Sequence, residues 1–158
     1  MKWTAGLAAG LLLLTTARAG ILPGFSLQDL NGSQFNTRDH VGKEVMVISF
    51  WATWCVPCKQ LLTKLDKIKK EHPAIRIIAI STDDSSTMVG VRPYIAGKKF
   101  DFTVLLDIDG KVIQMFDPEK KVPFTLVVDK AGSIVYSRTG YLPGDEKEIQ
   151  KIIEGLNR

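Results

Sequence analysis

The sequence has little material for a disulfide framework or a metal site. Its 158 residues contain only two cysteines, Cys55 and Cys58, and only two histidines, His40 and His72. A loop closed by cysteines three positions apart removes little entropy from the unfolded chain, so this pair would be a weak structural crosslink. A zinc site would need two further ligands, and the histidines are not clustered with the cysteines. The shortage therefore draws attention to the chemistry of the cysteine pair itself.

A strong excess of charge of either sign is also missing. The chain has 21 Lys and Arg against 17 Asp and Glu. Lysines at positions 64, 67, 69 and 70 are interleaved with apolar residues, as on the solvated face of a helix. With so mild a balance, we expect no nucleic-acid partner.

Residues 1–19 hold the one hydrophobic run that is typical of a targeting segment. Lys2 provides a short positive start, residues 5–16 are apolar or small, and the segment closes on Ala-Arg-Ala, a small-x-small cleavage site. An uncleaved membrane anchor would need roughly 17 to 25 apolar residues, and Arg18 interrupts the run before that length. We therefore expect a signal peptide that is cleaved before Gly20, with membrane attachment only if it is retained.

The remaining residues, 20–158, have the composition of one ordinary domain, without repeats or linkers. Apolar runs of strand length at 45–50 and 75–80 flank a helical pattern that begins near Cys55 and stops at His72-Pro73. Two such strands joined by one helix form a βαβ unit, in which the strands are parallel. The sequence therefore predicts an α/β domain.

Turn residues and hydrophobic periodicity predict the other elements. Asp145 and Glu148 resemble a capping box at the start of the last helix. The expected elements are a hairpin within residues 20–43, a helix over 88–96 bent at Pro93, a strand over 102–106, a short amphipathic piece ending near Phe116, a hairpin of strands 124–128 and 134–137, and a C-terminal helix.

Cys55 falls where the first buried strand gives way to the helix. Unpaired backbone N–H groups and the positive end of the helix dipole favour a thiolate there, so Cys55 is the predicted nucleophile. Cys58 lies one turn further along and is placed to resolve a mixed disulfide formed on Cys55. The residues alone leave three alternatives: an inert disulfide, two core thiols, and a peroxidase reaction that uses a single cysteine.

Two segments carry a resemblance to the thioredoxin superfamily: FWATWCVPCK at residues 50–59 and KVPFTLVVDKAGSIV further along the chain. The N-terminal FSLQDLNGSQF, the helical insert around residues 89–98 and TVLLDIDGKVIQMFD make the chain most similar to exported thiol-disulfide oxidoreductases of the TlpA/ResA type. The resemblance implies a thioredoxin fold, with a central mixed sheet flanked by helices, an N-terminal hairpin and a helical insertion. It implies a redox-active Cys55–Cys58 disulfide and neither cofactor nor metal.

The resemblance also implies substrate-binding roles around the dithiol. Pro123 would be a cis-proline that faces it, and Val122 would offer its backbone to an extended substrate chain. Gly140 matches the glycine of the family's third active-site loop. From the residues alone, a plain strand-opening proline would be favoured at Pro123, and only the resemblance reverses this; Tyr141 is equally a packing residue. The further candidate contacts are Trp54, which we expect to be exposed, together with Val56, Pro57 and Tyr141.

Two positions depart from the family's pattern. Ser49 stands where thioredoxins have a buried aspartate beneath the dithiol, and Leu61 stands where ResA-like proteins have a glutamate on the first helix. The usual carboxylate proton shuttle is therefore missing, which leaves a relay through Ser49 and water or direct transfer to solvent. Lys59 is expected to face solvent and to assist the thiolate slightly.

We predict an exported thiol-disulfide oxidoreductase of the bacterial periplasm that reduces the disulfides of partner proteins. The residues between the cysteines, Val56 and Pro57, include no histidine that would make the pair strongly oxidising. The expected partners are disulfide-bearing or cysteine-bearing exported proteins, with a membrane thiol reductant as electron donor. The alternatives are a non-catalytic binding module for cysteine-bearing or unfolded chains, and a thiol peroxidase with antioxidant activity.

Overall fold

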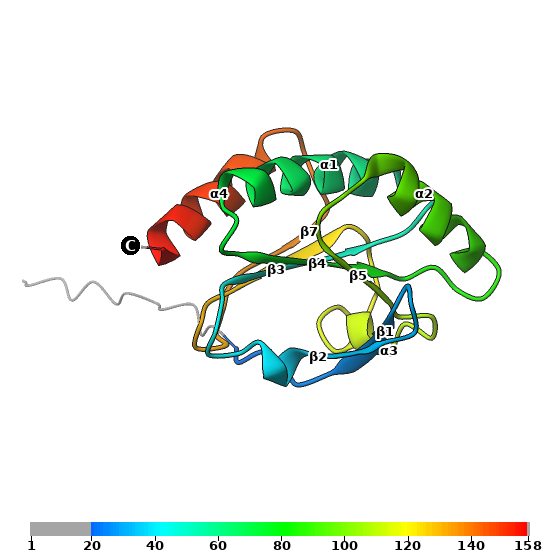
Figure 1. Ribbon diagram of the computed structural model, residues 1–158, viewed down its shortest axis with the longest axis horizontal. Helices are drawn as coiled ribbons and strands as arrows, with labels where there is room; N and C mark the ends of the chain where they lie inside the picture. The colour runs from blue at the N-terminus through cyan, green and yellow to red at the C-terminus, as the bar shows by residue number, and fades with distance from the viewer. Residues whose placement is uncertain (1–19, 158) are drawn as a thin grey trace, which may run out of the picture.

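A computed structural model describes residues 20–157, so the predicted signal peptide lies outside the described residues. Seven strands form one mixed sheet in the order β2-β1-β5-β4-β3-β6-β7, with helices on both of its faces (Figure 1). This arrangement confirms the predicted fold class. The elements are β1 (Ser26–Asp29), β2 (Gln34–Asn36), η1 (Thr37–Asp39), β3 (Met46–Trp51), α1 (Val56–Glu71), β4 (Arg76–Ser81), η2 (Met88–Gly90), α2 (Val91–Lys98), β5 (Thr103–Leu106), α3 (Lys111–Gln114), β6 (Phe124–Val128), β7 (Ile134–Thr139) and α4 (Asp145–Leu156).

β3 is an interior strand of the sheet, and all six of its residues are buried. It pairs in parallel with β4 on one side and antiparallel with β6 on the other. A strand that is flanked by neighbours and covered on both faces has a nearly continuous apolar sequence, and residues 46–51 are apolar except for Ser49. The parallel β3–α1–β4 unit is therefore confirmed.

The N-terminal hairpin belongs to the main sheet. β1 pairs antiparallel with β2 and also with β5, so the hairpin extends the sheet at its edge. The turn between its strands has Gly32 at a φ of 83°, a backbone conformation that favours glycine. The predicted hairpin extension is confirmed.

Two apolar layers sandwich the sheet. α1, α2 and α4 cover one face, and α3 lies on the other face with the N-terminal segment (Figure 1). Side chains alternate between the faces along a strand. Val47 and Trp51 of β3 accordingly belong to the cluster that also contains both cysteines, whereas Ile48 and Phe50 pack on the α3 side.

α1 begins and ends where its sequence predicts. Cys55 is the N-cap, and Pro57 lies in the first turn, where a missing N–H costs no helical hydrogen bond. The helix stops at His72, one residue before Pro73, and Lys69 and Lys70 of the last turn complement the helix dipole. The ends of α1 therefore fix the place of the first cysteine.

The predicted helix over residues 88–96 differs in detail. A 3₁₀ turn at Met88–Gly90 precedes α2, which runs further, to Lys98. Pro93 lies in the first turn of α2, where its missing N–H costs no helical hydrogen bond, and the change from 3₁₀ to α-helix falls before it, between Gly90 and Val91.

The predicted capping box on the last helix is also wrong. Gly144 is the N-cap of α4 and has no side chain to donate or accept a capping hydrogen bond. The Asp145 carboxylate instead accepts the Leu142 N–H at 2.7 Å and pairs with Arg138 at 3.0 Å. The Asp145 carboxylate is therefore occupied by a local hydrogen bond and by an ion pair with β7, and it does not cap the helix.

Within residues 20–157, no helix has the length and apolar content needed to cross a membrane.

Candidate active site

Cys55 and Cys58 form a disulfide at the N-terminus of α1. Their sulfur atoms are 2.02 Å apart and their Cα atoms 5.3 Å apart. Cys55 has extended backbone angles, φ −88° and ψ 104°, and its sulfur accepts the backbone N–H of Cys58 at 3.2 Å. An N–H that would stabilise a thiolate therefore already points at the first sulfur.

The two cysteines differ in accessibility. Cys55 is 5% exposed and Cys58 only 1% exposed. Exposed neighbours surround the more accessible cysteine: Trp54 is 66% and Val56 is 65% exposed, and Pro57 is also exposed. The exposure of Trp54 agrees with the expectation from its place before Cys55. An incoming disulfide would reach Cys55 before Cys58.

Pro123 lies at the same end of the sheet as the dithiol. Phe124 pairs with Phe50, which places Pro123 level with the end of β3, where the chain turns toward Cys55. The Val122–Pro123 peptide bond is cis, as the resemblance implied. The Pro123 carbonyl accepts the Gly140 N–H at 2.7 Å, and Val122 packs against both apolar clusters. The loops before β6 and after β7 thus meet at this end of the sheet.

Tyr141 belongs to a polar network that sequence reasoning missed. Its hydroxyl donates to Glu146 Oε2 at 2.9 Å, and the same oxygen accepts the Gly144 N–H at 2.8 Å. Burial and the hydrogen bond to Glu146 raise the pKa of Tyr141 to about 12. Burial alone would raise the pKa of Glu146, but hydrogen bonds from backbone N–H groups and from Tyr141, together with the charge of Lys64, lower it overall. Tyr141 therefore packs in its loop and anchors it. Glu146 was missed because the predicted capping box assigned the start of this helix to Asp145 and Glu148.

Ser49 lies on the dithiol side of the sheet, as its alternation with Val47 and Trp51 requires. It is 1% exposed, and its hydroxyl is 3.5 Å from that of Thr125 on β6. Leu61 is equally buried and packs in the same cluster as the cysteines. A neutral hydroxyl, that of Ser49, and an apolar side chain, that of Leu61, thus occupy the two positions where the family has carboxylates.

The expectation that Lys59 faces solvent holds only in part. Lys59 is half-buried, and its Nζ lies 5.0 Å from the centre of the Tyr94 ring, within the range of a cation–π contact. The Tyr94 ring in turn packs on Trp51, with 5.3 Å between ring centres. The helical insertion thereby contacts α1 and β3 next to the dithiol.

A second polar group that sequence reasoning missed is Asp83, in the loop that follows β4. It is 1% exposed, and its carboxylate accepts hydrogen bonds from Thr53 and Ser81. The signal in the sequence was its place two residues after a parallel strand, because the carboxyl ends of β3 and β4 lie side by side. Thr53 lies two residues before Cys55, so this acid adjoins the active-site turn.

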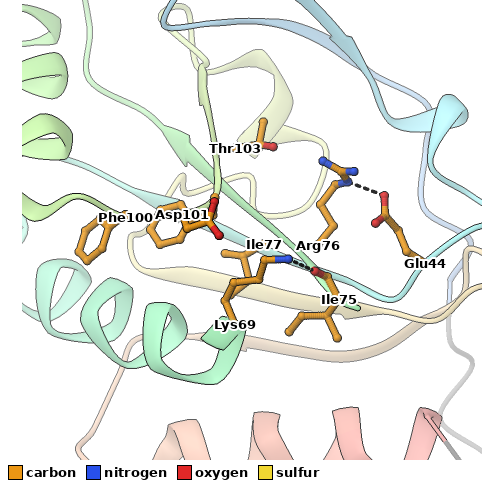
Figure 2. Close-up of a pocket in the computed structure, with 9 residues that line it drawn as sticks. Glu44, Lys69, Ile75, Arg76, Ile77, Phe100, Asp101 and Thr103 are labelled. Carbon is orange, nitrogen blue, oxygen red and sulfur yellow. Dashed lines mark hydrogen bonds and ion pairs between the residues drawn. The ribbon is translucent and has the colours of Figure 1, made fainter. Parts of the chain in front are cut away.

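A pocket of about 270 Å³ lies at the opposite end of the sheet (Figure 2). Arg76 and Thr103, the first residues of β4 and β5, line it, whereas Cys55 follows the last residue of β3. Three of its charged side chains are already paired: Arg76 with Glu44, and Lys69 with the Ile75 carbonyl, to which it donates at 2.8 Å. Burial would raise the pKa of Glu44, but its hydrogen bonds to Arg76 and His40 lower it overall. The pocket and the dithiol therefore lie at opposite ends of the sheet.

Within residues 20–157, no three His, Cys, Asp or Glu side chains gather as metal ligands would. His40 contacts Glu44 at 2.9 Å and stacks on Phe35. His72 lies 3.9 Å from Glu154. Both histidines are remote in the fold from the cysteine pair, so the chemistry of this site rests on its two sulfur atoms.

Comparison with known proteins identifies relatives along most of the chain. Residues 20–137 match the AhpC/TSA family. Thioredoxin-like protein YneN of Bacillus subtilis is 31% identical over 128 residues, which cover 80% of this chain and 74% of that protein. Thiol-disulfide oxidoreductase ResA of Bacillus thuringiensis subsp. konkukian is 28% identical over 120 residues, or 75% of this chain and 67% of that protein. An uncharacterized thioredoxin-like protein from Porphyromonas gingivalis superposes with a TM-score of 0.71 at 32% identity, covering 85% of this chain and 90% of that structure.

Proposed function

The chain belongs to the AhpC/TSA family of thioredoxin-like proteins and is a thiol-disulfide oxidoreductase, and we propose that it reduces disulfides of partner proteins through Cys55 and Cys58. The observation that carries the proposal is the placement of the cysteine pair. The Cys55 sulfur caps α1 and accepts an N–H, while Cys58 is buried one turn away within bonding distance. The resemblance to thioredoxins that the sequence indicated is confirmed by these relatives.

The exchange proceeds in two steps. The Cys55 thiolate attacks one sulfur of the partner's disulfide, which forms a mixed disulfide and releases the partner's other sulfur as a thiolate that takes up a proton. Cys58, after losing its own proton, then attacks the Cys55 sulfur. This second step releases the partner's remaining thiol and leaves the Cys55–Cys58 disulfide. Two electrons have passed to the partner, and a thiol reductant must restore the dithiol.

The apolar surroundings of Cys55 support a protein substrate. Trp54, Val56 and Pro57 are exposed beside the sulfur, and an exposed apolar surface of this kind binds extended peptide segments. Val122 precedes Pro123 and would pair its backbone with the substrate, as the resemblance implies. In this proposal Gly140 and Tyr141 support the Pro123 loop, since Gly140 donates to the Pro123 carbonyl.

The reducing direction rests on the residues between the cysteines. Val56 and Pro57 offer no charge that would stabilise the reduced pair, and strong oxidants owe their potential to that stabilisation. Partner proteins would be exported disulfide-bearing or cysteine-bearing chains. Export to the periplasm and the membrane thiol reductant that would return the electrons both depend on the signal peptide expected in residues 1–19.

Insulin reduction with dithiothreitol as electron donor tests the proposal. The wild-type protein should accelerate precipitation of the reduced insulin B chain, and Cys55→Ser should abolish that acceleration. Activity that survives Cys55→Ser would exclude dithiol exchange, whereas no activity in either protein would favour the binding module. Hydrogen peroxide consumption that survives Cys58→Ser would identify a peroxidase.

The partners can be captured with the same chemistry. Cys58→Ser should stall the reaction as a mixed disulfide on Cys55, because the resolving thiol is gone. The trapped partners should be released by dithiothreitol and should be absent from the Cys55→Ser, Cys58→Ser double variant, which is the matched control.

A further inference from the structure

A buried carboxylate holds the turn that leads to the dithiol. Asp83 Oδ2 accepts the backbone N–H of Thr53 at 2.9 Å, and Oδ1 accepts the Thr53 hydroxyl at 2.5 Å. The Ser81 hydroxyl donates to Oδ2 at 2.8 Å. One side chain therefore binds both polar groups of the residue that lies two positions before Cys55.

The Asp83 carboxylate has neutral partners only. None of the ion pairs within residues 20–157 includes Asp83. Its three donors are one backbone N–H and two hydroxyls, and the side chain is 1% exposed. A charge so placed is poorly screened by water and acts on neighbouring groups over a longer distance than a surface charge.

The ends of β3 and β4 are joined by a hydrogen bond that does not involve Asp83. The Thr82 N–H donates to the Trp51 carbonyl at 2.8 Å, which continues the pairing of β4 with β3. The contact between Asp83 and Thr53 is therefore not needed to pair the strands. It restrains the turn beyond the sheet, at Thr53 and Trp54.

We propose that Asp83 is a positioning residue of the dithiol, which fixes the turn before Cys55 through Thr53 and biases the cysteine pair toward donating electrons. This inference rests on the proposed dithiol exchange and adds a cause for its direction. The reduced pair can carry a thiolate on Cys55, whereas the disulfide carries no charge. A nearby fixed negative charge disfavours the thiolate, and so it favours the disulfide over the reduced pair.

The test is the equilibrium of the protein with glutathione. In this reaction two glutathione molecules give two electrons to the Cys55–Cys58 disulfide, which becomes the dithiol, and glutathione disulfide forms. Asp83→Asn removes the charge, but its amide can still accept the Thr53 N–H and donate to a hydroxyl oxygen. We expect the equilibrium constant for reduction of the protein to rise about tenfold, which is about 30 mV for a two-electron couple.

Thr53→Val should change the equilibrium constant in the opposite direction. It keeps the charge of Asp83 and removes one of its donors, so the carboxylate is less compensated and the thiolate is disfavoured further. The equilibrium constant and the rate of Cys55 alkylation by iodoacetamide at pH 7 should each fall about threefold. Thr53→Ser retains a hydroxyl and should restore the wild-type values.

Asp84→Asn is the matched control for charge. Asp84 is the next residue, but it is exposed and bonds only within its own turn, to Ser86 and Thr87. Its removal should leave the equilibrium with glutathione unchanged. If Asp83→Asn and Asp84→Asn shift the equilibrium constant alike, the shift reflects the net charge of the protein, and the assignment to Asp83 is overturned.

A purely structural role makes a different prediction. It lowers the melting temperature of Asp83→Asn and Thr53→Val but leaves the equilibrium constant of both at the wild-type value. That result overturns the proposal, and so does a shift of the same sign in both variants. If Asp83→Asn does not fold, the comparison of Thr53→Val with Thr53→Ser decides. The glutathione equilibrium is defined whether or not insulin is reduced, so a failure here is distinct from a failure of the proposed function.

Discussion

Replacing Ser49 by aspartate would return a carboxylate to the position where the thioredoxin pattern has one. Ser49 is 1% exposed, faces the layer that contains both cysteines, and has the Thr125 hydroxyl as its neighbour at 3.5 Å. A new carboxylate there would lie among apolar side chains and would have one hydroxyl donor. Ser49→Asn introduces a side chain of nearly the same size without the charge and serves as the control.

The cost can be worked out from burial. A fully buried carboxyl group has its pKa raised by up to about 3–5 units, and each unit corresponds to about 1.4 kcal/mol between the charged and neutral forms. A hydrogen bond from Thr125 to the charged form returns about 1.5–3 kcal/mol. We therefore expect Ser49→Asp to lose about 1–5 kcal/mol of unfolding free energy more than Ser49→Asn at pH 7.5, compared with the total of about 5–15 kcal/mol that is typical of whole proteins.

The loss should depend on pH with a defined sign. A carboxyl group whose folded pKa is raised binds its proton more tightly in the folded state than in the unfolded state. Stability therefore falls as the pH rises from the ordinary aspartate pKa, about 3.9, through the raised folded value. Urea unfolding of Ser49→Asp at pH 5 and pH 7.5 should show this decline, and Ser49→Asn should not.

The same pair of variants tests the missing proton shuttle. A carboxylate beneath the dithiol can accept the Cys58 proton in the resolving step, so Ser49→Asp should reduce insulin at pH 7 faster than Ser49→Asn. Equal stability of the two variants at both pH values would refute the assignment of position 49 to a dry site. Equal activity would show that the Cys58 proton leaves by a route that a group at position 49 does not serve.

Three further substitutions separate docking, packing and loop support. Trp54→Ala should raise the KM for insulin severalfold and change the unfolding free energy by less than about 0.5 kcal/mol, because the side chain is 66% exposed; an unchanged KM would remove Trp54 from the docking surface. Leu62→Ala should cost about 2–5 kcal/mol in urea unfolding, since Leu62 is fully buried under α1, and a cost below 1 kcal/mol would contradict the packing described. Glu146→Gln should lower the pKa of Tyr141 from about 12 in a spectrophotometric titration, because the carboxylate near its hydroxyl is gone. It should also weaken the loss of stability on acidification, since the pKa of Glu146 is lowered in the folded state and its contribution is lost as the pH falls through that value.

The sequence was sufficient for the fold because its strongest patterns are local. The apolar run of β3, the helical spacing of α1 and the stop at Pro73 each depend on neighbours within a few residues, and each appears in the structure. The capping box at Asp145 failed for the opposite reason. Arg138 on β7 and the Leu142 N–H compete for that carboxylate, and the partner on another element is visible only once the chain is folded.

The site shows the same division. The cysteine pair and the exposed Trp54 follow from one continuous motif, so the sequence was enough to place them. Asp83 was missed because it acts on Thr53, 30 positions earlier in the chain, whereas Glu146 was missed because the predicted capping box assigned the start of α4 to Asp145 and Glu148. In the sequence such acids look like ordinary surface residues; only the fold shows that Asp83 is buried and that Glu146 contacts Tyr141.

Two opposing electrostatic effects act on the Cys55 thiolate, and together they explain why this cysteine pair would donate electrons. The N-terminus of α1 offers a backbone N–H to the sulfur, which favours the thiolate and makes the cysteine reactive at neutral pH. Asp83 holds a negative charge on the strand side of the same turn, which disfavours the thiolate and makes the disulfide the more stable product. A reductase needs both, because its nucleophile must ionise and its disulfide must still be the preferred final state. Ser49 and Thr125 are neutral hydroxyls, whereas Asp83 is a buried carboxylate that contacts the active-site turn. The equilibrium of Asp83→Asn with glutathione would therefore show how much of the redox potential this one charge sets.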